Sequence, residues 1–369
     1  MNDVLLLTDT HFGCHNFSKG MFKSQMNYFE NVLFPYLIDN NIKDVIHLGD
    51  FVHNRNFVDL YILNILKNKF FKWFEDNEIN FYSIVGNHDT VYKNTNEYNF
   101  QAGSMMGYKF IHPILNPVIL RIGNYKFGLI PWAGSNNSDL PKPVDVDILA
   151  GHFEVTGALM QGNLYSKVGM KFEEFKEFKI VMSGHYHATS RKGNFLYLGS
   201  PYQTNWGDFC NKKGFWILKD GLELEYIENI TSPKFVKIIY NKDNSNPPEL
   251  SCVGLSDVPQ VITLSEAKSI CEKNHVKFIV KKNSDQHTLS VFFEQITENS
   301  YDRIDIFDES GFIEDIDDAQ LEKDIQEELE LSDIILNFLK TTTFQEDIKP
   351  EIISSMMERL LVRSKEYTS

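Results

Sequence analysis

Five short apolar runs, each ending in a polar residue able to bind a metal ion, constrain the fold of this chain more than any other feature. The run at 45–48 leads into Gly49, Asp50 and His53. Its Val and Ile residues suit a buried strand, and glycine permits a sharp turn at the strand end. Four other apolar runs end in the same way, at Asp9 and His11, at Asn87 and His88, at His152, and at His185 and His187.

The donors at these strand ends point to a metal site. If the strands share a sheet, their carboxyl ends meet at one edge, where open α/β sheets place ligand sites. Seven side chains then gather there without a cysteine among them: Asp9, His11, Asp50, Asn87, His152, His185 and His187. Seven donors are too many for one tetrahedral zinc and suit two hard or borderline ions such as manganese. The two oxygens of Asp50 are able to bridge such a pair, which would clamp a phosphate for attack by water.

A single Asp or His at a strand end is more often a cap or a satisfied polar residue than a ligand. Six of the eleven histidines, however, fall in the five strand ends, at positions 11, 53, 88, 152, 185 and 187. Chance accounts for one or two such coincidences and not for all five in this order. We therefore assign the six histidines to the site and the other five to structural roles.

Composition and charge narrow the class of protein. Four cysteines lie far apart, with no C-x-x-C pair, so neither a disulfide framework nor a zinc knuckle is indicated. We expect a soluble, intracellular protein, because no basic-then-apolar leader or apolar run of membrane-spanning length is evident. Of the net charge of −15, residues 301–369 carry −12 from 19 acidic and 7 basic side chains. The rest of the chain carries −3, so charge neither supports nor excludes binding to nucleic acid.

Periodicity predicts three regions. Apolar residues spaced by three or four indicate helices over 19–40 and 63–74, between strands, so residues 1–230 read as an α/β domain with helices on the faces of a sheet. Further strands are expected near 108–111, 118–121, 126–130, 195–198 and 214–218.

Residues 231–305 read as a small α+β domain, with strands at 235–240, 276–280 and 289–293 and a helix at 265–273. Residues 306–369 read as an acidic helix–loop–helix whose apolar face suggests docking on a partner.

The ordered set D-x-H, G-D-x-x-H, G-N-H-D, G-H and G-H-x-H resembles the signature of calcineurin-like metallophosphoesterases over about residues 1–220. Within that superfamily, the segment from Gly49 to Arg55 resembles the nuclease branch, because His53 stands where many relatives have Asp. The segment from Leu198 to Asp208 resembles phage recombination-endonuclease subunits, the viral relatives of bacterial SbcD. This resemblance implies a metallophosphoesterase sandwich, with mixed sheets flanked by helices.

The resemblance also implies roles for individual residues. One ion would be held by Asp9, His11, Asp50 and His187, and a second by Asp50, Asn87, His152 and His185. His88 would lie beside the scissile phosphate, where it could protonate the leaving oxygen. His53 would orient His88, and Asp89 would fix the turn rather than bind metal.

Substrate and partners are likewise implied only by the resemblance. It implies a manganese-dependent enzyme, with magnesium as the other candidate ion, that acts on DNA as a 3′–5′ exonuclease and a single-strand endonuclease in recombination or repair. An SMC-like ATPase would bind the C-terminal helices. This chain has no G-x-x-x-x-G-K-[ST] motif of its own, so any dependence on ATP would come from another chain. Residues 231–305 would cap the DNA. The resemblance further implies a homodimer that works in the cytoplasm, which for a phage protein is the cytoplasm of the host. It implies no membrane partner.

Two other functions remain open. The same ligand set serves phosphoesterases that act on a small phosphodiester or phosphomonoester, and a closed pocket rather than an open basic groove would favour them. A binding or scaffold subunit with an idle site is a third reading. It conflicts with the complete ligand set, because buried polar groups without an ion are costly.

Overall fold

The computed structural model describes residues 3–92, 94–132, 145–161, 164–241, 249–256, 258–280 and 305–308. The chain divides into two compact units, Met1–Gly311 and Phe312–Ser369. The second unit, the strand expected at 289–293 and the helices expected after residue 308 lie outside the described residues. Within the described ranges, no helix is both long and apolar enough to cross a membrane.

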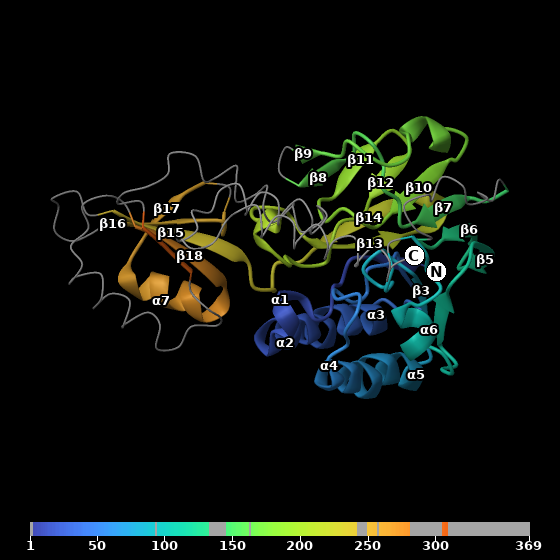
Figure 1. Ribbon diagram of the computed structural model, residues 1–369, viewed down its shortest axis with the longest axis horizontal. Coiled ribbons are helices and arrows are strands. Elements are labelled where there is room, and N and C mark those ends of the chain that lie inside the picture. Colours follow the sequence, from blue (N-terminus) through green and yellow to red (C-terminus); the bar gives the residue numbers. More distant parts are fainter. Residues whose placement is uncertain are drawn as a thin grey trace, which may run out of the picture. The chain divides into compact units, whose positions relative to one another are not determined.

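Two six-stranded mixed sheets form the first domain (Figure 1). In the first sheet four neighbouring strands run in parallel and two antiparallel strands lie at one side; in the second sheet four parallel strands lie between an antiparallel strand at each edge. The first sheet has the order β14 (Leu224–Glu228), β13 (Gly214–Leu218), β1 (Val4–Leu7), β2 (Asp44–His47), β3 (Asn80–Ile84), β4 (Ile111–Ile114). The second has the order β11 (Ser190–Lys192), β12 (Phe195–Tyr197), β10 (Ile180–Ser183), β7 (Ile148–Gly151), β6 (Tyr125–Ile130), β5 (Val118–Ile122).

The alternation of side chains along β1 explains how the sheets stack. Val4 and Leu6 face the second sheet, where they join Ile46, Phe127 and Met182 in one core. Leu5 and Leu7 face the other way and belong to the core beneath the helices. Because successive residues of a strand point to opposite faces, a strand that is apolar throughout is buried on both sides. The expected sandwich of mixed sheets with helices on a face is confirmed.

Two long helical segments cover the outer face of the first sheet (Figure 1). Each contains a π-helical stretch. The first comprises α2 (Lys19–Tyr28), η1 (Phe29–Leu33) and α3 (Phe34–Asp39), and the second comprises α4 (Leu60–Ile65), η2 (Leu66–Phe71) and α5 (Lys72–Asp76). Pro35 lies inside the first segment without ending it. A proline lacks the N–H that an α-helix would use there, and the wider turn that precedes it accommodates this loss.

Some local expectations were displaced. The strand expected at 108–111 begins at Ile111. Between the second-sheet strands β7 and β10 the chain forms a small hairpin of β8 (Leu159–Gln161) and β9 (Leu164–Tyr165) and a 3-10 turn, η4 (Phe172–Phe175). Short helical turns complete the domain: α1 (Cys14–Phe17), α6 (Phe100–Ser104), η5 (Trp206–Asp208) and η6 (Asp220–Leu222).

A five-stranded sheet with one helix forms the region after residue 234. Its order is β17 (Gln260–Ile262), β16 (Glu249–Val253), β15 (Phe235–Asn241), β18 (His275–Val280), β19 (Asp305–Asp308), and the helix is α7 (Leu264–Lys273). Thr263 and Glu266 begin that helix with reciprocal capping bonds. Strand β19 pairs in parallel with β18. The small sheet therefore extends three residues past 305, the boundary that the sequence predicts for this domain.

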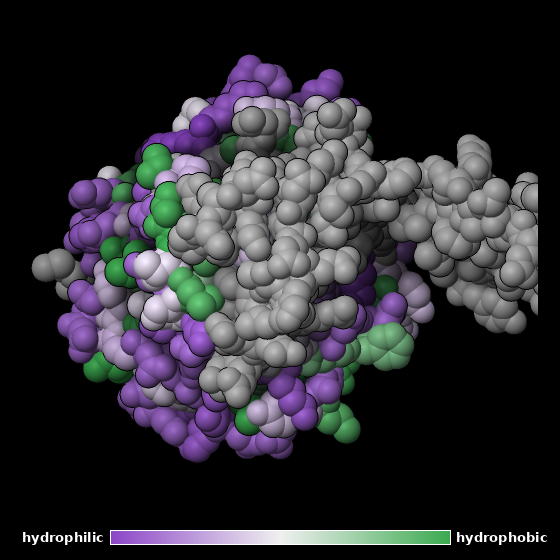
Figure 2. All heavy atoms as spheres, turned by 90° about the vertical axis from the view of Figure 1, so that its left-hand side faces the viewer, coloured by the Kyte–Doolittle hydropathy of each residue, from purple (hydrophilic) through white to green (hydrophobic). Residues whose placement is uncertain are grey.

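On the face of the molecule in Figure 2 the described side chains are mostly hydrophilic, with some apolar ones among them. The exposed apolar side chains of the described residues include four that are close together in sequence, Phe57, Val58, Leu60 and Tyr61, each 40–81% exposed.

Candidate metal centre

The five expected strand ends meet at one place, although the strands do not share a sheet. β1, β2 and β3 belong to the first sheet, and β7 and β10 to the second. Their carboxyl ends lie at the same side of the sandwich, and glycines let the two sheets approach. A Cβ on Gly49, whose φ is +89°, would lie 2.6 Å from Nδ1 of His152, and one on Gly86 would lie 2.1 Å from the backbone nitrogen of Asp50. The site is thus built across the sandwich.

One group of donors, here called site 1, comprises Asp9, His11, His187 and one oxygen of Asp50. The Nε2 atoms of His11 and His187 are 3.0 Å apart. From His11 Nε2, the nearest oxygen of Asp9 is 3.9 Å away and Oδ2 of Asp50 is 3.7 Å away. Atoms from three strand ends thus converge on a volume the size of one ion.

The second group, site 2, comprises Asn87, His152, His185 and the other oxygen of Asp50. The amide oxygen of Asn87 lies 2.8 Å from Nε2 of His152 and 2.9 Å from Nδ1 of His185. Oδ1 of Asp50 lies 3.4 Å from Nε2 of His152. The two carboxylate oxygens of Asp50 therefore face different groups, which is the geometry that a bridging ligand requires.

Hydrogen bonds outside the site orient the imidazole rings. Nδ1 of His152 lies 2.8 Å from the carbonyl oxygen of Leu48, and Nδ1 of His187 lies 3.3 Å from Oδ2 of Asp208. A ring that donates its Nδ1 proton outward turns the lone pair of Nε2 inward, as a metal ligand must. At site 2 the lone pair of His152 Nε2 faces the lone pairs of the Asn87 amide oxygen. Such a contact is favourable only when a proton or a cation lies between the nitrogen and the oxygen. The donor set therefore fits divalent ions.

The charges at the centre are coupled through Asp50. Burial acts to raise the pKa of Asp50, but His152 and His88 hold it well below its usual value. Burial acts to lower the pKa of His152, and the Asp50 carboxylate raises it to about 9. Burial and the nearby His88 lower the pKa of His11, so that ring is neutral at physiological pH. A cation between the site 2 donors would therefore have to displace a proton from His152, whereas the neutral ring of His11 has a nitrogen lone pair available.

His88 and His53 lie beside site 1. Nδ1 of His88 lies 2.7 Å from the backbone carbonyl of His53, and the two rings stack with centroids 5.3 Å apart. The ring of His88 is 4.8 Å from that of His11, and its backbone N–H donates to Oδ1 of Asp50 at 2.7 Å. Because Nδ1 is held by a carbonyl, Nε2 is the atom of His88 that remains for a substrate. His53 therefore contacts this ring both through its backbone carbonyl and by stacking of its own ring.

Asp89 is occupied by hydrogen bonds within the turn. Its Oδ1 accepts from the N–H of Val52 at 3.0 Å, and its Oδ2 accepts from the N–H of Gly86 at 2.8 Å and from Gln101 at 2.7 Å. These bonds tie the end of β2 to the end of β3. They agree with the expectation that Asp89 fixes the turn.

Three residues at the centre were not singled out for it by sequence reasoning. Oδ2 of Asp208 contacts His187, an oxygen of Glu154 lies 3.9 Å from Nε2 of His185, and the ring of Trp132 stacks on that of His185 at 5.9 Å. Glu154 follows His152 by two residues, a spacing that could have drawn attention to it. Asp208 lies 21 residues after His187, in a stretch with no apolar strand before it.

The backbone of the centre is strained. Four of the seven expected ligands have positive φ angles, namely Asp9 at 53°, His11 at 45°, Asp50 at 55° and His185 at 90°. A non-glycine residue pays about 1–2 kcal/mol for the left-handed conformation. Such strain is typical of functional sites, where the surrounding structure enforces it.

Comparison with known proteins agrees with this geometry. The family model for calcineurin-like phosphoesterase matches residues 3–189, slightly more than half of the chain. Exonuclease subunit 1 of Enterobacteria phage T4 is 26% identical over 234 residues, which is 62% of this chain and 68% of that protein.

Two solved structures are similar at lower identity. A protein of unknown function from Aquifex aeolicus is 16% identical, with a TM-score of 0.26, over 53% of this chain and 83% of the other. GAP50, the anchor in the inner membrane complex of Plasmodium, is 13% identical, with a TM-score of 0.35, over 84% of this chain and 98% of the other. On the family match, this chain belongs to the calcineurin-like phosphoesterases, a family of enzymes that depend on divalent metal ions.

Proposed function

We propose that this chain is a manganese-dependent DNA nuclease, acting as a 3′–5′ exonuclease on duplex ends and as an endonuclease on single strands. The observation that carries the proposal is the pair of donor groups joined by Asp50, with the ring of His88 beside them. The sequence similarity to an exonuclease subunit favours a nucleic-acid ester over other phosphate esters.

The site residues hold the metal in this proposal. Asp9, His11 and His187 would bind one ion, Asn87, His152 and His185 the other, and Asp50 both. The donor set of nitrogens and carboxylate oxygens without sulfur suits Mn²⁺, and Mg²⁺ is the other candidate. When bound, such a pair of ions polarises a phosphate and lowers the pKa of water for in-line attack.

His88 would act on the leaving group. In its doubly protonated form, the ring of His88 donates from Nδ1 to the carbonyl of His53 and carries its second proton on Nε2, from which it can pass to the 3′ oxygen as the ester bond breaks. The stacked ring of His53 limits rotation of His88. Proton donation by a positioned histidine contributes about 10²–10⁴-fold to such reactions.

The rest of the chain would serve the same reaction in a larger assembly. We propose the division 1–230 for the nuclease domain, 231–305 for a domain that caps DNA, and 306–369 for a helical region that docks an SMC-like ATPase. A homodimer that works in recombination and repair, in the cytoplasm of the host of a phage, is part of this proposal. Its support is the similarity to one subunit of a phage exonuclease.

A second candidate is a phosphoesterase that acts on a small phosphodiester or phosphomonoester. The observation in its favour is the burial of the donor groups, because Asp9, His152 and Asp50 are at most 1% exposed. Side chains so deeply buried would contact only the phosphate of a substrate, and a phosphate group is common to DNA and to small esters. Substrate choice therefore depends on residues around the site rather than on the ligands.

The experiment that tests the proposal is nucleotide release from 3′-labelled duplex DNA by the purified full chain, with Mn²⁺, Mg²⁺ or EDTA. We expect release with Mn²⁺ and none with EDTA. If neither duplex nor single-stranded DNA is cut while bis-p-nitrophenyl phosphate is hydrolysed, the small-ester alternative replaces the nuclease.

His88→Asn tests the assigned chemistry. The substitution removes the proton donor and keeps the ligands, so we expect DNA cleavage to fall by about 10²-fold or more while both Mn²⁺ ions stay bound. Asp50→Ala is the matched reference, because loss of the bridging carboxylate should remove both ions. Loss of an ion from His88→Asn would make His88 a ligand and contradict its role as an acid.

A further inference from the structure

A buried ion pair lies directly behind His187. Oδ2 of Asp208 accepts from the N–H of Thr204 at 2.8 Å and from its hydroxyl at 2.9 Å, and it faces Nδ1 of His187 at 3.3 Å. Oδ1 of Asp208 accepts from Nζ of Lys213 at 2.6 Å. The same Nζ donates to the backbone oxygen of His187 at 2.8 Å and to the hydroxyl of Ser200 at 2.9 Å. Lys213 thus uses all three of its donors.

The pair is costly to bury. The side chain of Asp208 is fully buried and that of Lys213 is 4% exposed. Burial acts to raise the pKa of Asp208, but Lys213 and His187 hold it well below its usual value, so the carboxylate is charged. Replacing a buried ion pair with well-packed apolar residues is often neutral or stabilising. Global stability is therefore a weak explanation for this pair, and its contact with His187 is the stronger one.

The geometry says what the pair does for His187. A proton on Nδ1 can be donated to Asp208, with the hydroxyl oxygen of Thr204 also 3.3 Å from that nitrogen. This leaves Nε2 with a lone pair that points at site 1, 3.0 Å from Nε2 of His11. A carboxylate behind a ligand histidine fixes its tautomer and raises its basicity toward a metal. Behind Nδ1 of His152, by comparison, lies the neutral carbonyl of Leu48.

Resting on the proposed two-ion site, we propose that Asp208 and Lys213 are positioning residues that hold His187 in the tautomer and orientation needed to bind an ion at site 1. Asp208 fixes the imidazole through Nδ1. Lys213 fixes the main chain of the same residue and keeps the carboxylate in place. Together they set the affinity of site 1 and leave site 2 unaffected.

The turn that carries Asp208 is held firmly. The side chain of Asn205 caps it, accepting from the N–H of Gly207 at 2.8 Å. Trp206 packs against Phe235 with ring centroids 5.0 Å apart, and the ammonium of Lys277 lies 4.6 Å from the centroid of the Trp206 ring. Strands β15 and β18 thus brace the turn from outside, so the carboxylate meets His187 in a fixed orientation.

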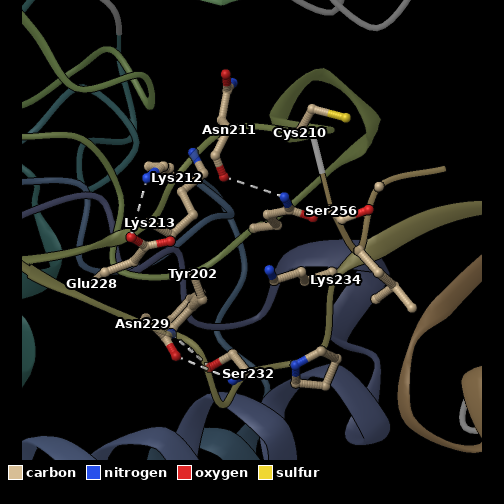
Figure 3. Close-up of a pocket in the computed structure, with 14 residues that line it drawn as sticks. Tyr202, Cys210, Asn211, Lys212, Lys213, Glu228, Asn229, Ser232, Lys234 and Ser256 are labelled. Carbon is tan, nitrogen blue, oxygen red and sulfur yellow. Dashed lines mark hydrogen bonds and ion pairs between the residues drawn. The ribbon is translucent and has the colours of Figure 1, made fainter. Parts of the chain in front are cut away.

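Lys213 also lies on the wall of a cavity of about 400 Å³ (Figure 3). Tyr202, Asn229 and Lys234 line the same cavity, and Figure 3 shows the amine of Lys234 directed toward its interior. The space is large enough for a small alkylammonium ion. This makes chemical rescue of a truncated Lys213 feasible.

The test is titration of the metal-free full chain with Mn²⁺, followed by electron paramagnetic resonance and calorimetry. We expect two ions in the wild type. In Asp208→Asn we expect the ion at site 1 to bind about 10- to 100-fold more weakly, with the second ion unchanged. His187→Gln removes a ligand of site 1, so the binding step that it weakens is identified as that of the ion at site 1. Asp147→Asn is the matched control, because that carboxylate accepts from the N–H of Lys126, away from the centre.

A second variant keeps the inference testable if Asp208→Asn folds poorly. Lys213→Ala should weaken binding of the ion at site 1, and n-propylammonium, which replaces the deleted atoms, should restore the affinity for that ion.

Unchanged binding of both ions to either folded variant would overturn the inference while leaving the proposed function intact. Equal weakening of both ions, in step with a lower melting temperature and without rescue, would also overturn it, because the pair would then be only structural. A wild-type chain that binds no Mn²⁺ would overturn the proposed function itself, and the inference with it.

Discussion

Replacement of Asp89 separates a structural role from metal binding at the centre. The carboxylate accepts three hydrogen bonds, from the N–H groups of Val52 and Gly86 and from the side chain of Gln101. It is 3% exposed. In Asp89→Ala two buried main-chain N–H groups lose their acceptor. Each costs about 1–3 kcal/mol, so we expect the free energy of unfolding to fall by about 2–6 kcal/mol.

Asp89→Asn is the milder change. Asparagine has the same shape as aspartate, but an NH₂ group replaces one of the two carboxylate oxygens. That NH₂ group cannot accept a hydrogen bond from the donor it faces, so one hydrogen bond is lost at a cost of about 1–3 kcal/mol. Burial and the charge of Asp50 raise the pKa of Asp89 to about 7. The comparison is therefore best made at pH 8, where the wild-type carboxylate is ionised.

Urea unfolding in EDTA measures these losses, and Mn²⁺ titration of the same preparations counts the ions. We expect the free energy of unfolding to fall in both variants, and to fall further in Asp89→Ala than in Asp89→Asn. We expect Asp89→Asn to retain two ions. An Asp89→Asn protein that unfolds at the wild-type urea concentration but binds one ion fewer would refute the reasoning, because Asp89 would then be a ligand.

Two further predictions test the packing of the centre and of the fold. Gly86→Ala should abolish binding of both ions, since its Cβ would lie 2.1 Å from the nitrogen and 2.3 Å from Oδ1 of Asp50; Gly103→Ala, where nothing lies within 4 Å, should bind two ions as the wild type does. A thiol reagent such as DTNB at pH 8 should label one cysteine in the folded chain and four in denaturant, because Cys210 is exposed and the others are buried. Burial raises the pKa of those three thiols to about 12, 11 and 12, so they stay protonated; fast labelling of more than one would contradict the described burial of Cys14, Cys252 and Cys271.

The part of the fold that the sequence predicts is the part with local signals. The helical stripes at 19–40 and 63–74 depend on neighbours within a few residues. In the structure these helices cover the first sheet. Periodicity also identified the strands that end at the donors. These features need no knowledge of what packs against them.

The rest depends on contacts between distant residues. Nothing local says that β1, β2 and β3 lie in one sheet and β7 and β10 in another, because both sets are apolar on both faces. Strand β16 was not expected, because it follows a polar stretch and is recognised only by its pairing with β15. Asp208 meets His187 through a short turn that has no periodicity. A one-dimensional pattern predicts elements and does not predict which of them meet.

Strain and hydrogen bonding at the centre have a common explanation. Asp9, His11 and Asp50 have positive φ angles, and their side chains lie close together at the ends of β1 and β2. Main-chain bonds from Asp9 to Gly49 and from His11 to Asp50, both 3.0 Å, hold these conformations in place. The strain is therefore balanced by contacts between the ends of β1 and β2 rather than by any one residue. In this arrangement the sandwich keeps seven donors in a fixed geometry, so little further ordering is needed when ions bind.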